Sequence, residues 1–84
     1  MHKRDERLKR LKLLRNVGEK TAPKLLELGI ETPGQMLEAD PEALYEEWRR
    51  RNGGTLDRCV LYQLRGAKYG MAWPECKDPF TPPY

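Results

Sequence analysis

Prolines and glycines constrain the fold of this chain most, because they divide it into short segments that carry helix-start and helix-stop signals. Thr32-Pro33-Gly34-Gln35 and Asp40-Pro41 each place an N-capping side chain before a proline, which is the pattern of a helix start. Gly29 and Asn52-Gly53-Gly54 supply the glycines that commonly end helices. No segment between these signals shows the alternating pattern of a strand. The sequence therefore predicts an all-α fold of short helices.

Apolar residues recur at helical spacing between these signals and predict about five helices. Near the N-terminus, Leu8, Leu11 and Leu14 fall on one stripe of a segment that is otherwise mostly basic. Tyr45 and Trp48, three apart, are expected in the core, although aromatic side chains in this chain could also stack on exposed bases. The expected helices cover 5–15, a stretch from 20 or 21 to 28, a brief stretch after 33, 41–51, and a stretch after 57 that reaches 71.

The length of 84 residues supports one domain, which we place at residues 1–73, with a Pro-rich tail over 74–84. Four prolines in this tail predict an extended or irregular path. Gly66 and Gly70 lie four apart in the last helix and form a small-residue strip that another helix could approach closely.

Charge is unevenly distributed along the chain. The 16 Lys and Arg residues against 13 Asp and Glu residues give a net charge of +3. Residues 1–24 carry nine basic and three acidic side chains, a net +6, so residues 25–84 carry a net −3. A basic end of this kind favours attraction to a polyanion, either nucleic acid or an anionic surface. The alternative is a solvated helix face that keeps the protein in solution.

The segment from Asn16 to Thr21 is the motif with the clearest chemistry. Two short helices joined by Asn16-Val17-Gly18, with Gly18 directly before the second helix, resemble a helix-hairpin-helix motif. Backbone N–H groups at the start of the second helix lack an internal acceptor, and a glycine leaves room for a phosphate to reach them. Asn16 replaces the first glycine of the usual pair, and Glu19 adds a carboxylate that favours a purely structural hairpin. The expected nucleic-acid-binding residues are Arg15, Asn16, Val17, Gly18, Lys20, Thr21 and Lys24.

A longer resemblance covers residues 13–73. This region is similar to the C-terminal domain of the TfoX/Sxy competence regulators and to bacterial helix-hairpin-helix proteins described as pathogenicity-locus or mitomycin-resistance proteins. The resemblance implies an all-helical domain related in shape to DNA-binding modules, and the proline-rich end from Pro74 departs from the family pattern. It is carried by Asn16-Val17-Gly18, Leu28-Gly29-Ile30-Glu31-Thr32, Asp40-Pro41-Glu42-Ala43-Leu44-Tyr45, Asp57-Arg58-Cys59-Val60-Leu61-Tyr62 and Leu64-Arg65-Gly66-Ala67-Lys68-Tyr69.

Residues for other chemistry are sparse. His2 is the only histidine, and Cys59 and Cys76 stand alone, so neither a metal site nor a disulfide framework is predicted. Cys59 is expected in the core and Cys76 on the exposed tail. The segment 18–21 lacks the upstream glycine and the strand of a phosphate-binding loop. We expect no enzyme, cofactor or small-molecule substrate, and, without a signal peptide or membrane span, a cytoplasmic location.

Two functional hypotheses follow from the sequence. In the first, the protein binds DNA without sequence preference and in a salt-sensitive way, through the amides of the hairpin turn and the flanking Lys and Arg side chains. In the second, the hairpin is structural, and the tail or the face with Gly66 and Gly70 meets a protein partner or a second copy of the chain.

Overall fold

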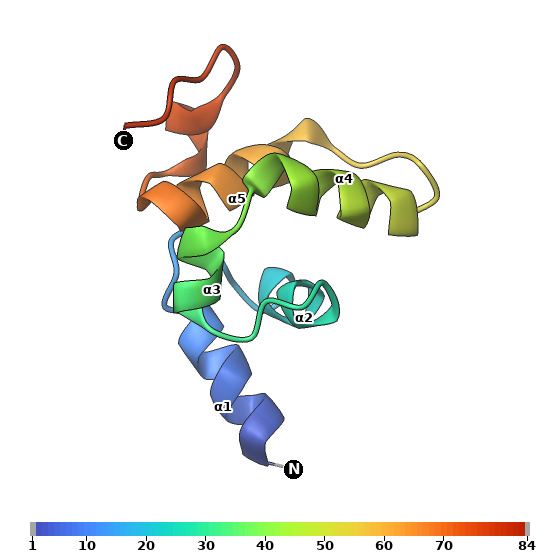
Figure 1. The fold of residues 1–84 in the computed structure, drawn as a ribbon, viewed down its shortest axis with the longest axis vertical. Coiled ribbons are helices and arrows are strands. Elements are labelled where there is room, and N and C mark those ends of the chain that lie inside the picture. Colours follow the sequence, from blue (N-terminus) through green and yellow to red (C-terminus); the bar gives the residue numbers. More distant parts are fainter. Residues whose placement is uncertain (1, 84) are drawn as a thin grey trace.

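Five α-helices and a short 3-10 helix follow one another in the computed structural model, which describes residues 2–83 (Figure 1). Within these residues there is no strand, so the predicted all-α fold is confirmed. The elements are α1 (His2–Leu11), α2 (Thr21–Glu27), α3 (Pro33–Glu38), α4 (Pro41–Arg51), α5 (Arg58–Tyr69) and η1 (Trp73–Cys76).

Three helices begin at the capping residues that the sequence indicates. The Thr32 hydroxyl accepts the Gln35 N–H at 3.2 Å, and the Gln35 side chain accepts the Thr32 N–H at 3.2 Å, which completes a capping box. The Asp40 carboxylate accepts the Glu42 N–H at 3.0 Å at the start of α4. Asp57 accepts the Cys59 N–H at 2.9 Å at the start of α5, and this bond lowers the pKa of the Asp57 carboxyl.

The first helix differs from its predicted span. It covers His2–Leu11 instead of 5–15, because the backbone tightens after Leu11. Leu13 N–H donates to Arg10 O at 3.1 Å and Leu14 N–H donates to Leu11 O at 3.0 Å, and such i to i−3 bonds end an α-helix. The leucine stripe keeps its contact with the core nevertheless, since Leu11 is fully buried and Leu8 and Leu14 pack beside it.

The core gathers around α5. Leu61 and Leu64 of α5 are buried together with Leu25 of α2, Met36 of α3 and Tyr45 of α4. Figure 1 shows α4 and α5 lying side by side, and α1 packs on α2 while projecting away from the rest of the molecule. The result is a single compact domain with extents of 41 × 30 × 19 Å. Within residues 2–83, no helix is both long enough and apolar enough to cross a membrane.

The segment after α5 folds back onto that helix. Residues Trp73–Cys76 form η1 in the region predicted to be extended or irregular. Arg65 of α5 is 6% exposed, and its guanidinium bonds to Cys76 O at 2.9 Å, to Asp78 at 2.7 Å and to Glu42 at 3.0 Å. The ring of Phe80 lies against the same guanidinium, whose central carbon is 5.0 Å from the centre of the ring. Residues 73–80 are therefore packed against the helical body.

The two cysteines are both free thiols. The expectation that Cys76 lies exposed on the tail is wrong: it is the last residue of η1 and is fully buried, and this burial raises the pKa of the thiol. Cys59, expected in the core, is half-buried. Its pKa is raised mainly by the hydrogen bond with Asp57.

Candidate nucleic-acid interface

The connection between α1 and α2, residues 12–20, is anchored by Asn16. We call this segment the α1–α2 turn. Asn16 has a φ of 68°, in the left-handed region that asparagine adopts more readily than most residues. Its side-chain amide donates to Met71 O at 2.9 Å and to Gln63 O at 3.4 Å. These bonds therefore attach the turn to α5 and to Met71. Met71 directly follows Gly70, the C-terminal cap of α5.

A glycine in α5 makes this attachment possible. A Cβ atom on Gly66 would collide with the Asn16 amide nitrogen and with the Met71 carbonyl oxygen. The close packing expected along Gly66 and Gly70 thus occurs at Gly66, but with the α1–α2 turn instead of another helix. Gly66 is buried, so it is not accessible to a protein partner.

The start of α2 leaves backbone donors without a protein acceptor. Lys20 is the N-cap residue and provides no side-chain cap, whereas α3, α4 and α5 each begin with one. Ala22 N–H donates to Gly18 O at 3.0 Å. Within residues 2–83, the N–H groups of Glu19, Lys20 and Thr21 have no hydrogen-bond acceptor. A Cβ atom on Gly18 would meet nothing within 4 Å, so the space beside this part of the turn is open.

The structure separates the expected binding residues by exposure. Val17 is 7% exposed and its N–H donates to Leu14 O at 3.2 Å, so it is a packing residue. Lys24 is half-buried, with its ammonium group 3.4 Å from Glu27. The others reach the surface: Arg15, Gly18 and Lys20 are exposed, and Asn16 and Thr21 are half-buried.

The carboxylate of Glu19 is neutralised within the turn. Lys12 lies 2.7 Å from it and forms an ion pair. The repulsion of a phosphate that Glu19 would otherwise cause is therefore reduced by a positive charge from the same turn.

Ion pairing divides the basic side chains into two groups along the chain. All five arginines beyond residue 48 contact a carboxylate: Arg49, Arg50, Arg51, Arg58 and Arg65. Bonds from Arg50 and Arg51 lower the pKa of Glu47 to about 2. Six cations of α1 and the turn have no ion pair within the described part of the chain, and we call them the unpaired cations: Lys3, Arg4, Lys9, Arg10, Arg15 and Lys20.

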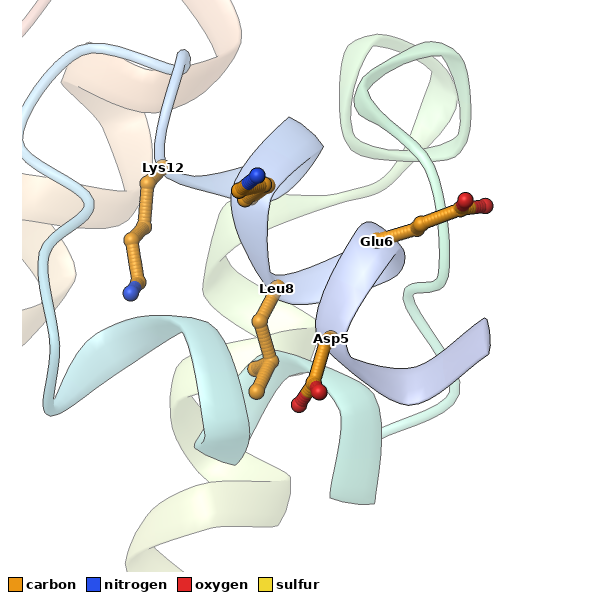
Figure 2. Close-up of a pocket in the computed structure, with 5 residues that line it drawn as sticks. Asp5, Glu6, Leu8 and Lys12 are labelled. Carbon is orange, nitrogen blue, oxygen red and sulfur yellow. The ribbon is translucent and has the colours of Figure 1, made fainter. Parts of the chain in front are cut away.

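The unpaired cations of α1 surround the helix instead of forming one stripe. Lys3 and Arg10, seven apart, share one side of α1. Lys9 lies elsewhere, in a hollow of about 620 Å³ that also includes Asp5 and Glu6. Figure 2 shows these two carboxylates pointing in different directions from α1. This hollow combines both signs of charge, so it adds little net attraction for an anion.

A second hollow lies directly beside the turn. It has a volume of about 450 Å³ and is lined by Gly18 and Lys20 of the turn and by Trp48, Val60 and Gln63 from α4 and α5. The sequence places Trp48 in the core, and the indole does pack partly against it. The same side chain also lines this hollow, because α4 lies beside the turn. No local pattern in the sequence indicates that arrangement.

Metal ligands are not grouped in the described part of the chain. Within residues 2–83, no cluster of three or more His, Cys, Asp or Glu side chains could hold a metal ion.

These features define a small all-helical domain whose unpaired positive charge is concentrated at its N-terminal end. A family model described as "Cdd1: Pathogenicity locus" matches residues 4–80, and the chain belongs to that family. The match extends through residue 80, so it includes part of the segment from Pro74 that was expected to depart from the family pattern. No match was found among the curated proteins, and none was found among the solved structures.

Proposed function

We propose that this protein binds DNA without sequence preference, with α1, the α1–α2 turn and α2 acting as a helix-hairpin-helix. The observation that carries the proposal is the position of the unpaired cations. These six lie on α1 and the turn, whereas every arginine of the second half contacts a carboxylate. Lys77, which also has no ion pair within residues 2–83, lies over the Trp73 ring instead. Cations without a protein partner can neutralise phosphates and release their counterions.

The turn supplies contacts that complement this charge. Its free N–H groups lie next to the exposed Lys20, and the open space beside Gly18 lets a phosphate approach the backbone. The bonds from Asn16 to α5 hold the turn in one conformation, so little ordering is needed on binding. Contacts of this kind fix a protein on the nucleic-acid backbone and do not read bases.

The resemblance of residues 13–73 to the TfoX/Sxy C-terminal domain supports the same proposal, as does membership of a family with a helix-hairpin-helix resemblance. A cytoplasmic location belongs to this proposal, since that is where a bacterial chromosome is found.

The proposal is tested by fluorescence anisotropy with a labelled duplex over a range of salt concentrations. We expect R15Q/K20Q to weaken binding of two unrelated duplexes to the same extent. The salt slope of log K should become shallower by about 2, because two phosphate contacts are lost. The matched control is R49Q/R50Q, which removes the same charge from residues that are paired with Glu46 and Glu47. It should leave the slope nearly unchanged.

Two results would count against the proposal. The first is no binding by the wild-type protein at micromolar concentration and low salt. The second is equal weakening by the two double variants, because net charge alone would then account for binding and the turn would have no particular part in it.

A protein-interaction role is the second candidate, and one observation favours it. Leu13 in the turn is 82% exposed and Leu37 of α3 is 53% exposed, and contact with another chain would remove this apolar surface from water. Light scattering after size exclusion distinguishes self-association from the 9.8 kDa monomer. A dimer that L13S converts to a monomer would support this candidate.

A further inference from the structure

The hollow beside the α1–α2 turn combines chemical groups that suit a planar heterocycle. Trp48 provides an indole surface and Val60 provides an apolar wall. Thr21 and Gln63 add a hydroxyl and an amide, and neither side chain makes a hydrogen bond to another residue within residues 2–83. Lys20 contributes an unpaired ammonium group to the same lining. The one carboxylate in the lining, Glu19, is ion-paired with Lys12 at 2.7 Å.

The walls of this hollow are held apart by contacts within the protein. Asn16 is bonded to Gln63 O and Met71 O, so the turn and α5 keep a fixed separation. Trp48 is packed against the core on one side. Gly18 has no side chain to fill the opening, and nothing lies within 4 Å of the position that its Cβ would take.

The other hollows have different chemistry. The one on α1 has two carboxylates and no aromatic ring. The one on the outer side of α4 is formed by ion pairs of Glu46 and Glu47 with arginines and has no aromatic ring. The one under Phe80 has Glu38, Asp40 and Glu42 in its lining, which disfavours an anionic strand. The hollow beside the turn alone among these four joins an aromatic wall to an unpaired cation.

We propose that this hollow holds one unpaired nucleobase of a DNA strand whose phosphates lie against the unpaired cations. The inference rests on the proposed function, because the strand must first be attracted to α1 and the turn. The base would stack on Trp48, its polar edge would face Gln63 and Thr21, and the adjacent phosphate would lie near Lys20. A paired base is stacked inside its duplex and cannot enter, so the protein should prefer single-stranded DNA or frayed ends over uninterrupted duplex.

The test uses two single strands with the same number of phosphates, an oligothymidine and an abasic strand of equal length. Fluorescence anisotropy at low salt should show about ten-fold tighter binding of the oligothymidine, the range that stacking of one base on an aromatic side chain provides. W48L should remove this difference, so that the oligothymidine binds no more tightly than the abasic strand. W48F keeps an aromatic surface and should retain most of the difference.

A second measurement does not depend on the stability of a Trp48 variant. In W73F, Trp48 is the only tryptophan left. Its fluorescence should be quenched by the oligothymidine and not by the abasic strand.

The possible failures are distinguishable. Equal affinities for the two strands, or equal quenching by both, would overturn this inference and leave the proposed function intact. If neither strand nor a duplex binds at low salt, the proposed function fails and this inference fails with it.

Discussion

Two residues of the described structure, Asn16 and Gly66, have roles that few other residue types could fill at their positions. Asn16 adopts a left-handed backbone and also donates two long-range hydrogen bonds, which a glycine at the same position could not donate. Gly66 accepts the approach of this side chain because it has no Cβ. The sequence indicated that Asn16 could form the turn, and it marked Gly66 as a packing position. It did not indicate that the two residues meet, since they are fifty positions apart in the chain.

At this scale we predict that G66A destabilises the protein by about 2 kcal/mol, because its new methyl group must displace either a backbone carbonyl or the Asn16 amide. Urea denaturation measures the change. The matched control is G34A in α3, where the new Cβ would lie 3.8 Å from the Thr32 hydroxyl, an ordinary contact. G34A should be neutral or slightly stabilising, since alanine is the better helix former. Equal effects of the two substitutions would show that the Asn16 contact contributes nothing.

Among the features of the helices, the sequence predicted their first residues best, and the capping contacts explain why. Thr32 and Gln35 bond within three residues, and Asp40 and Asp57 each cap a residue two positions later. Such bonds are local and can be read from adjacent letters. The end of α1 was predicted four residues too late. The helical spacing of the leucines continues to Leu14, whereas the α-helical hydrogen bonding of the backbone ends after Leu11.

Capping should matter most in α3, which has only six residues. We predict that T32A lowers the free energy of unfolding by about 1 kcal/mol, because it removes the hydroxyl that accepts the Gln35 N–H and leaves that donor only the Thr32 carbonyl at 3.1 Å. T55A, at an exposed threonine outside the helices, is the control and should change stability by much less. A T32A protein as stable as wild type in urea would mean that packing of Met36, and not the cap, holds α3 in place.

At the scale of the whole molecule, the C-terminal segment is held on the helical body by contacts that sequence patterns did not reveal. Arg58 and Arg65 of α5 both bind Asp78, at 2.6 and 2.7 Å, and thereby hold the C-terminal segment on the helical body. Bonds from Arg58 and then Arg65 lower the pKa of Asp78. The candidate interface has the same character, since Trp48 reaches the turn only through the tertiary arrangement of α4. Local signals predict where helices start, whereas these pairings depend on how the helices are packed.

The lowered pKa of Asp78 leads to a prediction about acid. The folded pKa lies below the unfolded one, so the stabilisation is complete above about pH 4 and is lost as the pH falls through the folded value. We expect D78N to be less stable than wild type at pH 7 and to lose less stability between pH 5 and pH 2. Urea denaturation in a W48F background, where Trp73 is the only tryptophan, measures both by fluorescence. E47Q, which removes another low-pKa carboxylate away from η1, should not alter the Trp73 signal of the folded protein.

Because the amide of Asn16 holds the carbonyl of Met71, the cationic end of the protein and its last quarter are mechanically joined. A chain cut ahead of Met71 would lose more than η1 and the segment behind it. The loop between the first two helices would be released as well, and its donors would no longer be preorganised for an anion. Integrity of the C-terminal end is thus a condition for the proposed DNA binding at the opposite end of the sequence.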